Sequence, residues 1–234
     1  MTNELERFYA LLELLAGGPG QGNALADCNG RAAWAPRGVY FFLEPGEHRR
    51  DRPQVPRIVR VGTHAVSAGS RSTLWGRLRA HRGGRDGSGN HRGSIFRLHV
   101  GMALLAADEA RLPTWGVGAS AARAVRDTEV AHEQRVSLHI GAMSVLWVDV
   151  PDEAGPQSAR SIIERNAIAL LSNHQTPPDP PSTQWLGRSS PRREIACSGL
   201  WNLNYVNDRC DPRFLDVLES HVTAQMARAR QLTG

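Results

Sequence analysis

Two short apolar segments that follow one another closely constrain the fold of this 234-residue chain more than any other feature. Residues 38–43 are rich in β-branched and aromatic side chains, and Glu44-Pro45-Gly46 then predicts a turn. Residues 57–62 alternate polar and apolar side chains, which is typical of a strand with one buried face. A loop of about a dozen residues joins the two segments. The pattern therefore predicts a β-hairpin.

Helical periodicity accounts for much of the remaining chain. Residues 72–81 begin with Ser or Thr at the N-cap position and carry apolar side chains at 74, 75 and 78, which predicts a short amphipathic helix. A helix over residues 157–171 would place Ile162, Ile163 and Ala167 on one face. We also expect helices over residues 1–16, 94–107 and 214–232 and strands over residues 136–140 and 144–150, while residues 108–133 show no clear pattern. This order indicates an α+β fold around a small sheet.

Glycine and proline runs suggest how the chain divides. The segment from Gly17 to Gly22 contains four glycines and a proline and predicts a loop, so we expect the first helix to be a peripheral element. We divide the chain into an N-terminal helix and linker (1–30), a central domain (31–175) with an insertion at about 101–135, and a C-terminal extension (176–234).

Positive charge is concentrated in one part of the chain. Between Arg31 and His99 there are fourteen arginines and four acidic residues, whereas the rest of the chain is net negative. Phosphate contacts supply most of the sequence-independent affinity for nucleic acid, and a clustered basic segment is typical of such a surface. All 28 basic residues are arginine, which a coding bias would explain, but a coding bias does not explain the clustering.

Several classes of protein are excluded. No run approaches the ~20 apolar residues that cross a bilayer, and the first helix carries Glu4, Glu6 and Glu13 where a signal peptide would be basic. The three cysteines are far apart and match neither a disulfide framework nor the spacing of a zinc site. We therefore expect a cytoplasmic protein with free thiols and no membrane partner.

Four short motifs follow one another along the predicted strands and helices. Gly38-Val39-Tyr40 lies in the first predicted strand, Arg60-Val61-Gly62 lies in the second, Arg77 and His81 share the next helix, and Glu164 lies in a later helix. In this order they resemble the GIY-YIG nucleases over about residues 37–175. The resemblance implies a small mixed or antiparallel three-stranded sheet flanked by helices, with an insertion and extra helices at both ends of the chain.

The chemistry of phosphodiester hydrolysis explains why these residue types would be needed. Arg77 and His81 lie at i and i+4 on one helix face, and a guanidinium there can grip two oxygens of the scissile phosphate. The resemblance implies that Tyr40 takes a proton from the attacking water, helped by a base such as His81. It also implies that Glu164 holds one Mg²⁺ or Mn²⁺ per active site. Each residue alone has an ordinary structural explanation, but the ordered set favours catalysis.

The chain departs from the family at one position. Arg60 stands where the family's second tyrosine usually stands, and His64 is a candidate to compensate by hydrogen bonding near Tyr40 or the attacking water. The family also places an asparagine shortly after the helix that carries the glutamate. Asn173 is the first candidate for this role, and Asn202 is the second.

A group of basic residues is expected to bind nucleic acid. His91 matches a polar position beside the active site in some members of the family, although it would equally suit a surface loop. The candidate nucleic-acid-binding residues are Arg60, Arg71, Arg79, Arg82, His91 and Arg92.

These expectations lead to a metal-dependent endonuclease that acts on DNA. A catalytic domain without a recognisable zinc finger or helicase part resembles small restriction enzymes, which suggests phage defence and a homodimer that cuts both strands. Bases would then be read by about residues 101–135 or by residues 174–234. The alternatives are a nucleic-acid-binding module that has lost cutting, motivated by Arg60, and an interaction protein whose arginines meet an acidic partner chain.

Overall fold

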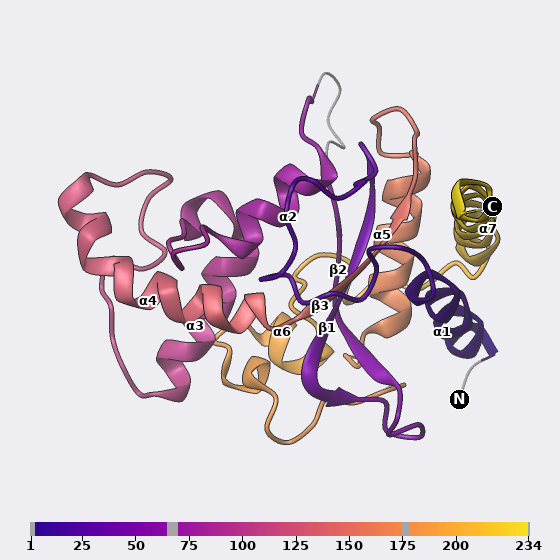
Figure 1. Cartoon of the computed structure of the whole chain (residues 1–234). Coiled ribbons are helices and arrows are strands. Elements are labelled where there is room, and N and C mark those ends of the chain that lie inside the picture. The colour runs from indigo at the N-terminus through magenta and orange to yellow at the C-terminus, as the bar shows by residue number, and fades with distance from the viewer. Residues whose placement is uncertain (1–2, 65–69, 175–177, 234) are drawn as a thin grey trace.

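The protein folds around one three-stranded sheet with helices on both faces (Figure 1). A computed structural model describes residues 3–64, 70–174 and 178–233. The strands are β1 (Gly38–His48), β2 (Pro56–Thr63) and β3 (Ser144–Asp149). The helices are α1 (Asn3–Ala16), α2 (Leu74–Arg82), α3 (Ile95–Ala107), α4 (Arg123–Gly141), α5 (Ala159–Leu171), α6 (Arg193–Ser198) and α7 (Phe214–Thr233), with short 3₁₀ helices η1 (His91–Gly93) and η2 (Leu186–Ser189).

The sheet is antiparallel throughout, with the strand order β2-β1-β3. The central strand pairs Tyr40 with Gly62 on one side and with Trp147 on the other. Residues directly opposite one another in an antiparallel pair point to the same face, so these three positions form a row across the sheet. The predicted α+β class and three-stranded sheet are therefore confirmed.

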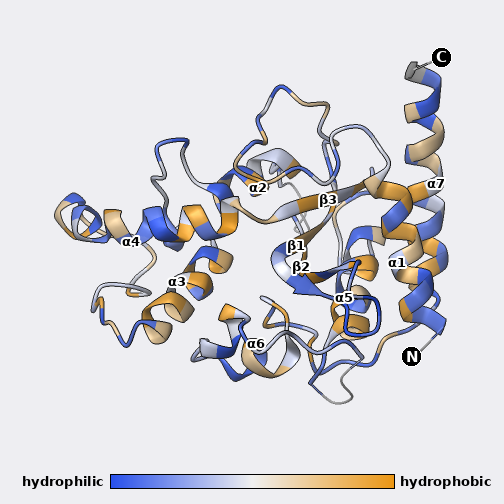
Figure 2. Ribbon diagram, turned by 60° about the horizontal axis from the view of Figure 1, so that its bottom comes forward, coloured by the Kyte–Doolittle hydropathy of each residue, from blue (hydrophilic) through white to orange (hydrophobic). Residues whose placement is uncertain are grey.

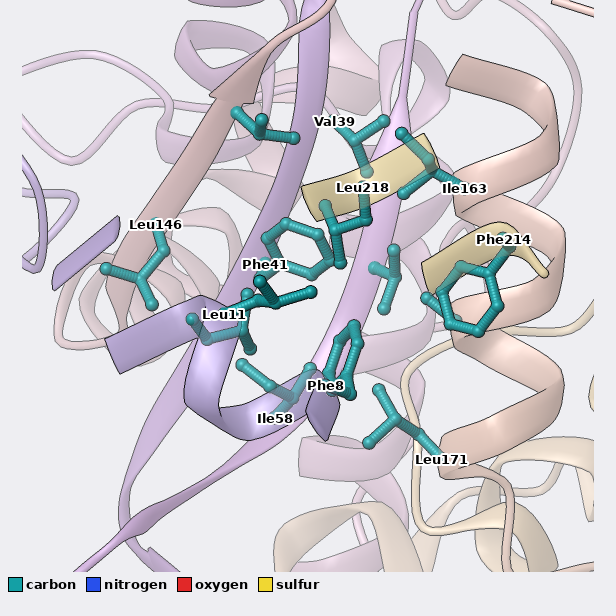
Figure 3. Close-up of a cluster of buried hydrophobic side chains, with 14 of the residues drawn as sticks. Phe8, Leu11, Val39, Phe41, Ile58, Leu146, Ile163, Leu171, Phe214 and Leu218 are labelled. Atoms are coloured by element: carbon teal, nitrogen blue, oxygen red, sulfur yellow. The ribbon is translucent and has the colours of Figure 1, made fainter. Parts of the chain in front are cut away.

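Two cores cover the two faces of the sheet. On one face, Val39 and Phe41 pack with buried apolar side chains of α1, α5 and α7, as Figure 3 shows for Phe8, Ile163 and Phe214. On the other face, Tyr40 and Phe42 meet buried side chains of α2, α3 and α4. The pair formed by α3 and α4 extends away from the sheet in Figures 1 and 2.

Three local predictions were wrong. β1 does not end at Glu44-Pro45-Gly46 but continues to His48. Its pairing register with β2 shifts between Leu43 and His48, and this irregularity lets the strand continue past the proline and glycine. Residues 136–140 belong to α4, where Val136 and Ile140 are buried at positions i and i+4. Over so short a run, apolar residues at this helical spacing cannot be told from the alternation of a strand. The first helix is not peripheral, since Phe8 and five other α1 side chains are buried in the core.

Other helices formed where the sequence predicts them. α2 begins after Thr73, whose hydroxyl accepts a hydrogen bond from the Gly76 amide at 3.1 Å, as an N-cap residue does. α3 has the equivalent cap at Ser94, and α5 has one at Ser158. Within the described part of the chain, no helix is both long enough and apolar enough to cross a bilayer.

Candidate active site

Tyr40 begins a buried chain of hydrogen-bonding groups on the α2 face of the sheet. Its hydroxyl lies 2.9 Å from Nε2 of His81, which α2 carries over β1. Nδ1 of the same imidazole lies 2.7 Å from the hydroxyl of Ser94, at the start of α3. Burial lowers the pKa of His81 well below its usual value, and Arg60, Arg77 and Arg97 lower it further. The imidazole is therefore neutral at physiological pH.

Gly62 leaves the space that the Tyr40 hydroxyl occupies. A Cβ atom at position 62 would lie 2.3 Å from the Tyr40 oxygen, well inside van der Waals contact. The glycine of the second strand is thus required by the close approach of the tyrosine opposite it.

We expect Gly62→Ala to displace Tyr40 while the strand itself forms. Misplacing a reacting group by about 1 Å can cost on the order of a hundredfold in rate, so cleavage of DNA should fall by roughly that factor. Single-turnover cleavage and thermal unfolding together measure the effect. Gly155→Ala is the matched control, because nothing lies within 4 Å of a Cβ atom there. Cleavage by Gly62→Ala at the wild-type rate would contradict this explanation.

Arg77 follows the N-cap of α2 by one helical turn and is half-buried. Its charge acts on His81 in the same helix, on Glu164 in α5 and on His64 after β2. The Arg77 guanidinium is therefore within electrostatic range of all three groups. It can supply two parallel N–H donors to a phosphate that enters the site.

Glu164 reaches the same cluster from α5, on the opposite side of β2. Its Oε1 atom accepts a hydrogen bond from the Thr63 amide at 3.1 Å, at the end of β2. Its Oε2 atom makes no hydrogen bond to any residue that the structure describes. Burial raises the pKa of this carboxyl group, and Arg60, the Thr63 amide and Arg77 oppose that rise.

This donor set fits a magnesium ion. Mg²⁺ is commonly held by one or two carboxylates, with water and substrate phosphate completing its shell, so a full cage of protein ligands is not needed. Among the described residues no group of three or more His, Cys, Asp or Glu side chains is arranged to hold a metal. The half-buried Glu164 carboxylate, with one oxygen anchored by Thr63 and the other without a hydrogen bond to a described residue, would suit such an open site.

Arg60 lies beneath this cluster and is only 6% exposed. It stands opposite Phe42 in the β1–β2 pair, and its guanidinium carbon lies 4.6 Å from the ring centre of Phe96. One terminal nitrogen donates to the carbonyl of Trp201. Arg60 therefore sits in the interior of the site and not on a surface that meets a nucleic-acid backbone.

His64 is also buried, directly after β2. Its Nδ1 lies 3.1 Å from the carbonyl oxygen of Ser72, which makes Nδ1 the protonated nitrogen, while Nε2 has no hydrogen-bond partner within the described chain. Burial lowers the pKa of His64 to about 4; Arg160, Arg37 and Arg77 contribute, and the hydrogen bond to Ser72 opposes them. A neutral imidazole with an uncommitted nitrogen can accept a hydrogen bond near the cluster.

The side chains of the two asparagine candidates form hydrogen bonds with backbone groups of other segments. The Asn173 side chain donates to the carbonyl oxygens of Asp179 and Ser198 at 3.0 Å and accepts from the Asp179 amide. The Asn202 side chain accepts from the Val61 amide at 3.1 Å and donates to the Val61 carbonyl at 2.8 Å, so it pairs with the outer edge of β2 like a further strand. The structure therefore gives both asparagines backbone partners outside the Tyr40–His81 contact.

The remaining predicted basic residues differ in exposure. Arg71 and Arg79 are exposed. Arg82 is half-buried, with one terminal nitrogen 2.6 Å from the Cys28 carbonyl and its guanidinium over the Trp75 ring. Arg71 and Arg79 are thus the two whose guanidinium groups are presented to solvent beside α2.

His91 and Arg92 are held inside the pair of helices α3 and α4. His91 Nδ1 lies 3.0 Å from a carboxylate oxygen of Glu133, and Nε2 accepts a hydrogen bond from the Gly116 amide. Arg92 makes two contacts with Glu129 at 2.6 and 2.8 Å, and its side chain is 4% exposed. Neither residue presents a free polar group to a ligand.

Glu133 links His91 to the buried Arg97 and so stabilises the packing of α3 on α4. We expect Glu133→Ala to lower the free energy of unfolding by about 3–5 kcal/mol, because it leaves a buried guanidinium without its counter-ion. Chemical denaturation measures this change. Asp127→Ala, in the same helix and with its side chain 64% exposed, should change stability little. Equal stability of the two variants would contradict the role given to Glu133.

Several residues that shape the site were not predicted. Ser94 was expected only as the start of a helix, yet its hydroxyl also holds His81. Thr63 anchors Glu164 through its backbone amide, which no side-chain pattern reveals. The N-cap spacing before α3 was the one signal in the sequence that singled out Ser94.

In this fold a strand tyrosine contacts a helix histidine, and the charge of an arginine in the same helix acts on a glutamate of a second helix. The family model of the GIY-YIG domain matches residues 1–228. The chain therefore belongs to the GIY-YIG family of nucleases. No curated protein and no solved structure matches it.

Proposed function

We propose that this protein is a metal-dependent endonuclease that hydrolyses phosphodiester bonds in DNA. The observation that carries the proposal is the contact of the Tyr40 hydroxyl with a neutral, buried His81, within electrostatic range of Arg77 and near Glu164. The order of the elements supports the proposal, because Tyr40 lies on β1, Arg77 and His81 lie on α2, and Glu164 lies on α5.

Each side chain has a distinct role in the proposed mechanism. Tyr40 takes a proton from the attacking water, and His81 fixes the position of the phenol oxygen through their hydrogen bond. Arg77 binds two oxygens of the scissile phosphate and stabilises the charge that grows there. Glu164 holds one Mg²⁺ or Mn²⁺, which, when bound, would supply further charge stabilisation at the phosphate.

The setting that fits best is restriction or phage defence. One active site cuts one strand, so a homodimer would break both strands of a duplex. Exposed arginines beside α2, Arg71 and Arg79, are suited to the DNA backbone in the same complex. We place the enzyme in the cytoplasm, where its DNA substrate lies.

An inactive nucleic-acid-binding module is the second candidate, because Arg60 replaces the family's second tyrosine. Incubation of supercoiled plasmid with the purified protein separates the two functions. An endonuclease converts the plasmid to open-circular and linear forms with Mg²⁺ or Mn²⁺ and leaves it intact in a chelator. Salt-sensitive retention of DNA without any metal-dependent product would instead identify the binding module.

A further inference from the structure

A cavity of about 390 Å³ lies beside β3, the edge strand of the sheet, and the proposed mechanism makes no use of it. Its walls come from the chain that precedes β1, from β3 itself and from the end of α7. The lining side chains that matter most are Ala33, Trp34, Trp147, Asp149 and Arg228. Sites for small molecules commonly have volumes of ~300–1,000 Å³, so the cavity is large enough for a ligand with a ring system.

One wall of the cavity is aromatic and held in a fixed position. The Trp34 ring stacks on Trp75 of α2, with 5.1 Å between the ring centres and 20° between the planes. Its centre also lies 5.8 Å from that of Trp147, and its Nε1 donates to the carbonyl oxygen of Asn29 at 2.7 Å. A ligand that stacks here would meet rings that are already ordered, which reduces the entropic cost of binding. This wall therefore suits a flat aromatic ligand.

A buried carboxylate oxygen adds a polar requirement. The Oδ2 atom of Asp149 accepts a hydrogen bond from Arg228 at 2.7 Å, whereas Oδ1 is buried and has no hydrogen-bond partner among the described residues. A buried acceptor without a donor is costly, so a ligand that brings an N–H group to this oxygen gains affinity. The amino groups of adenine and cytosine are donors of this kind. The aromatic wall and the free oxygen together fit a nucleobase.

The backbone beside the cavity is not available to an extended peptide. The Gln21 side chain accepts from the Trp147 amide at 2.8 Å and donates to the Trp147 carbonyl at 2.9 Å. The Gln225 side chain accepts from the Asp149 amide at 2.7 Å. Because these side chains already pair with the outer edge of β3, a peptide cannot bind here by adding a strand to the sheet.

The cavity lies close to the proposed catalytic groups. Trp147 stands opposite Tyr40, and both of its backbone groups point outward to Gln21, so the two residues form a non-hydrogen-bonded pair. Side chains in such a pair are neighbours, with Cβ atoms about 4.5–5.5 Å apart. Trp75, which supports Trp34, precedes Arg77 by two residues in α2. A DNA strand whose phosphate contacts Arg77 would thus have its neighbouring nucleotides near the cavity.

We propose that this cavity binds one unpaired base of the DNA strand, stacked on Trp34 and hydrogen-bonded through an amino group to Asp149. The inference rests on the proposed function, which makes DNA the ligand. A base inside a duplex is covered on both faces by its neighbours, so it must leave the stack before it can enter the cavity. The site would favour adenine, cytosine or guanine, which carry an amino group, over thymine, which does not.

Fluorescence anisotropy of labelled single-stranded oligonucleotides tests the proposal directly. The measurement is made in a chelator, so that no metal-dependent cleavage occurs, and it compares oligo(dC), oligo(dT) and an abasic chain of the same length and charge. We expect oligo(dC) to bind about 5- to 150-fold more tightly than the abasic chain, because a base gains stacking on an aromatic side chain. It should also bind roughly threefold or more tightly than oligo(dT), because its amino group donates to Asp149.

Two variants remove the base site in different ways. Trp34→Ala deletes the stacking ring, whereas Ala33→Phe fills the cavity from an exposed loop position without deleting any contact. Both should abolish the preference for oligo(dC) over the abasic chain, and Ala33→Phe gives the answer even if Trp34→Ala fails to fold. Asp149→Asn should reduce the preference for oligo(dC) over oligo(dT). Leu138→Ala, at a position of α4 that is 78% exposed, is the control and should keep both preferences.

The outcomes separate this inference from the proposed function. Equal affinity of the wild type for oligo(dC) and the abasic chain would overturn the base site, and so would an unchanged preference in folded Ala33→Phe. Neither result bears on cleavage, because the assay contains no free metal. A protein that prefers oligo(dC) but never cuts plasmid DNA would instead refute the endonuclease and keep the base site.

Discussion

Replacing Glu164 with Gln should reduce metal-dependent cleavage of plasmid DNA by roughly a thousandfold or more, which corresponds to a loss of about 4 kcal/mol of transition-state stabilisation. The amide keeps the shape of the side chain and can still accept from the Thr63 amide. It no longer carries the negative charge that holds a divalent cation. Single-turnover cleavage at increasing Mg²⁺ concentrations measures the loss.

The thermal stability of Glu164→Gln should not fall along with its cleavage activity. Burial raises the pKa of Glu164 in the folded protein, so ionisation of this carboxyl group costs stability at every pH above its unfolded-state pKa, including neutral pH. Glu164→Gln removes that cost and should unfold at the same temperature as the wild type or higher. Glu153→Gln, at an exposed position, is the control for loss of one negative charge. Full cleavage by Glu164→Gln would exclude this carboxylate as the metal ligand.

Arg77→Ala should have the second largest effect, a decrease of about a thousandfold in single-turnover rate. Its guanidinium is the half-buried cation that acts on His81, His64 and Glu164 together, so no other charge in α2 can replace it at the phosphate. Little change in folding is expected, because the side chain is not fully buried.

The same helix provides the matched control. Arg79 is exposed two residues further along α2, and Arg79→Ala removes an equal charge. It should weaken DNA binding modestly and reduce the salt dependence of binding by about one unit of slope, with the rate at saturating DNA almost unchanged. If the two variants lost cleavage equally, a general loss of positive charge would explain the result better than a specific phosphate contact.

The strongest sequence signals located the hairpin and the helix that follows it. Tyr40 and His81 lie on elements whose strand or helix periodicity is clear, and the structure brings these two side chains into contact. A short apolar pattern gave a wrong prediction at residues 136–140, which were expected to form a strand but belong to helix α4. Helix α1 was expected at the periphery because a glycine-rich loop follows it. Its apolar face instead packs in one core with side chains of β3 and α7.

Charge along the sequence was a weaker guide to the binding surface. Of the fourteen arginines between residues 31 and 99, Arg49, Arg57, Arg60 and Arg97 are buried. Arg57 pairs with Glu47, and Arg97 pairs with Glu133. A cluster of arginines in the sequence therefore contains buried, ion-paired cations as well as solvent-facing ones, and only the fold separates them.

The most direct test of the central claim is single-turnover nicking of supercoiled plasmid by two double variants of equal charge. The first is Glu164→Ala with Arg77→Ala, and the second is Glu153→Ala with Arg79→Ala. We predict that the wild type and the second variant nick the plasmid only when Mg²⁺ or Mn²⁺ is present, and that the folded first variant gives no product above the metal-only background. Equal nicking by both variants would contradict a hydrolytic site built from Arg77 and Glu164.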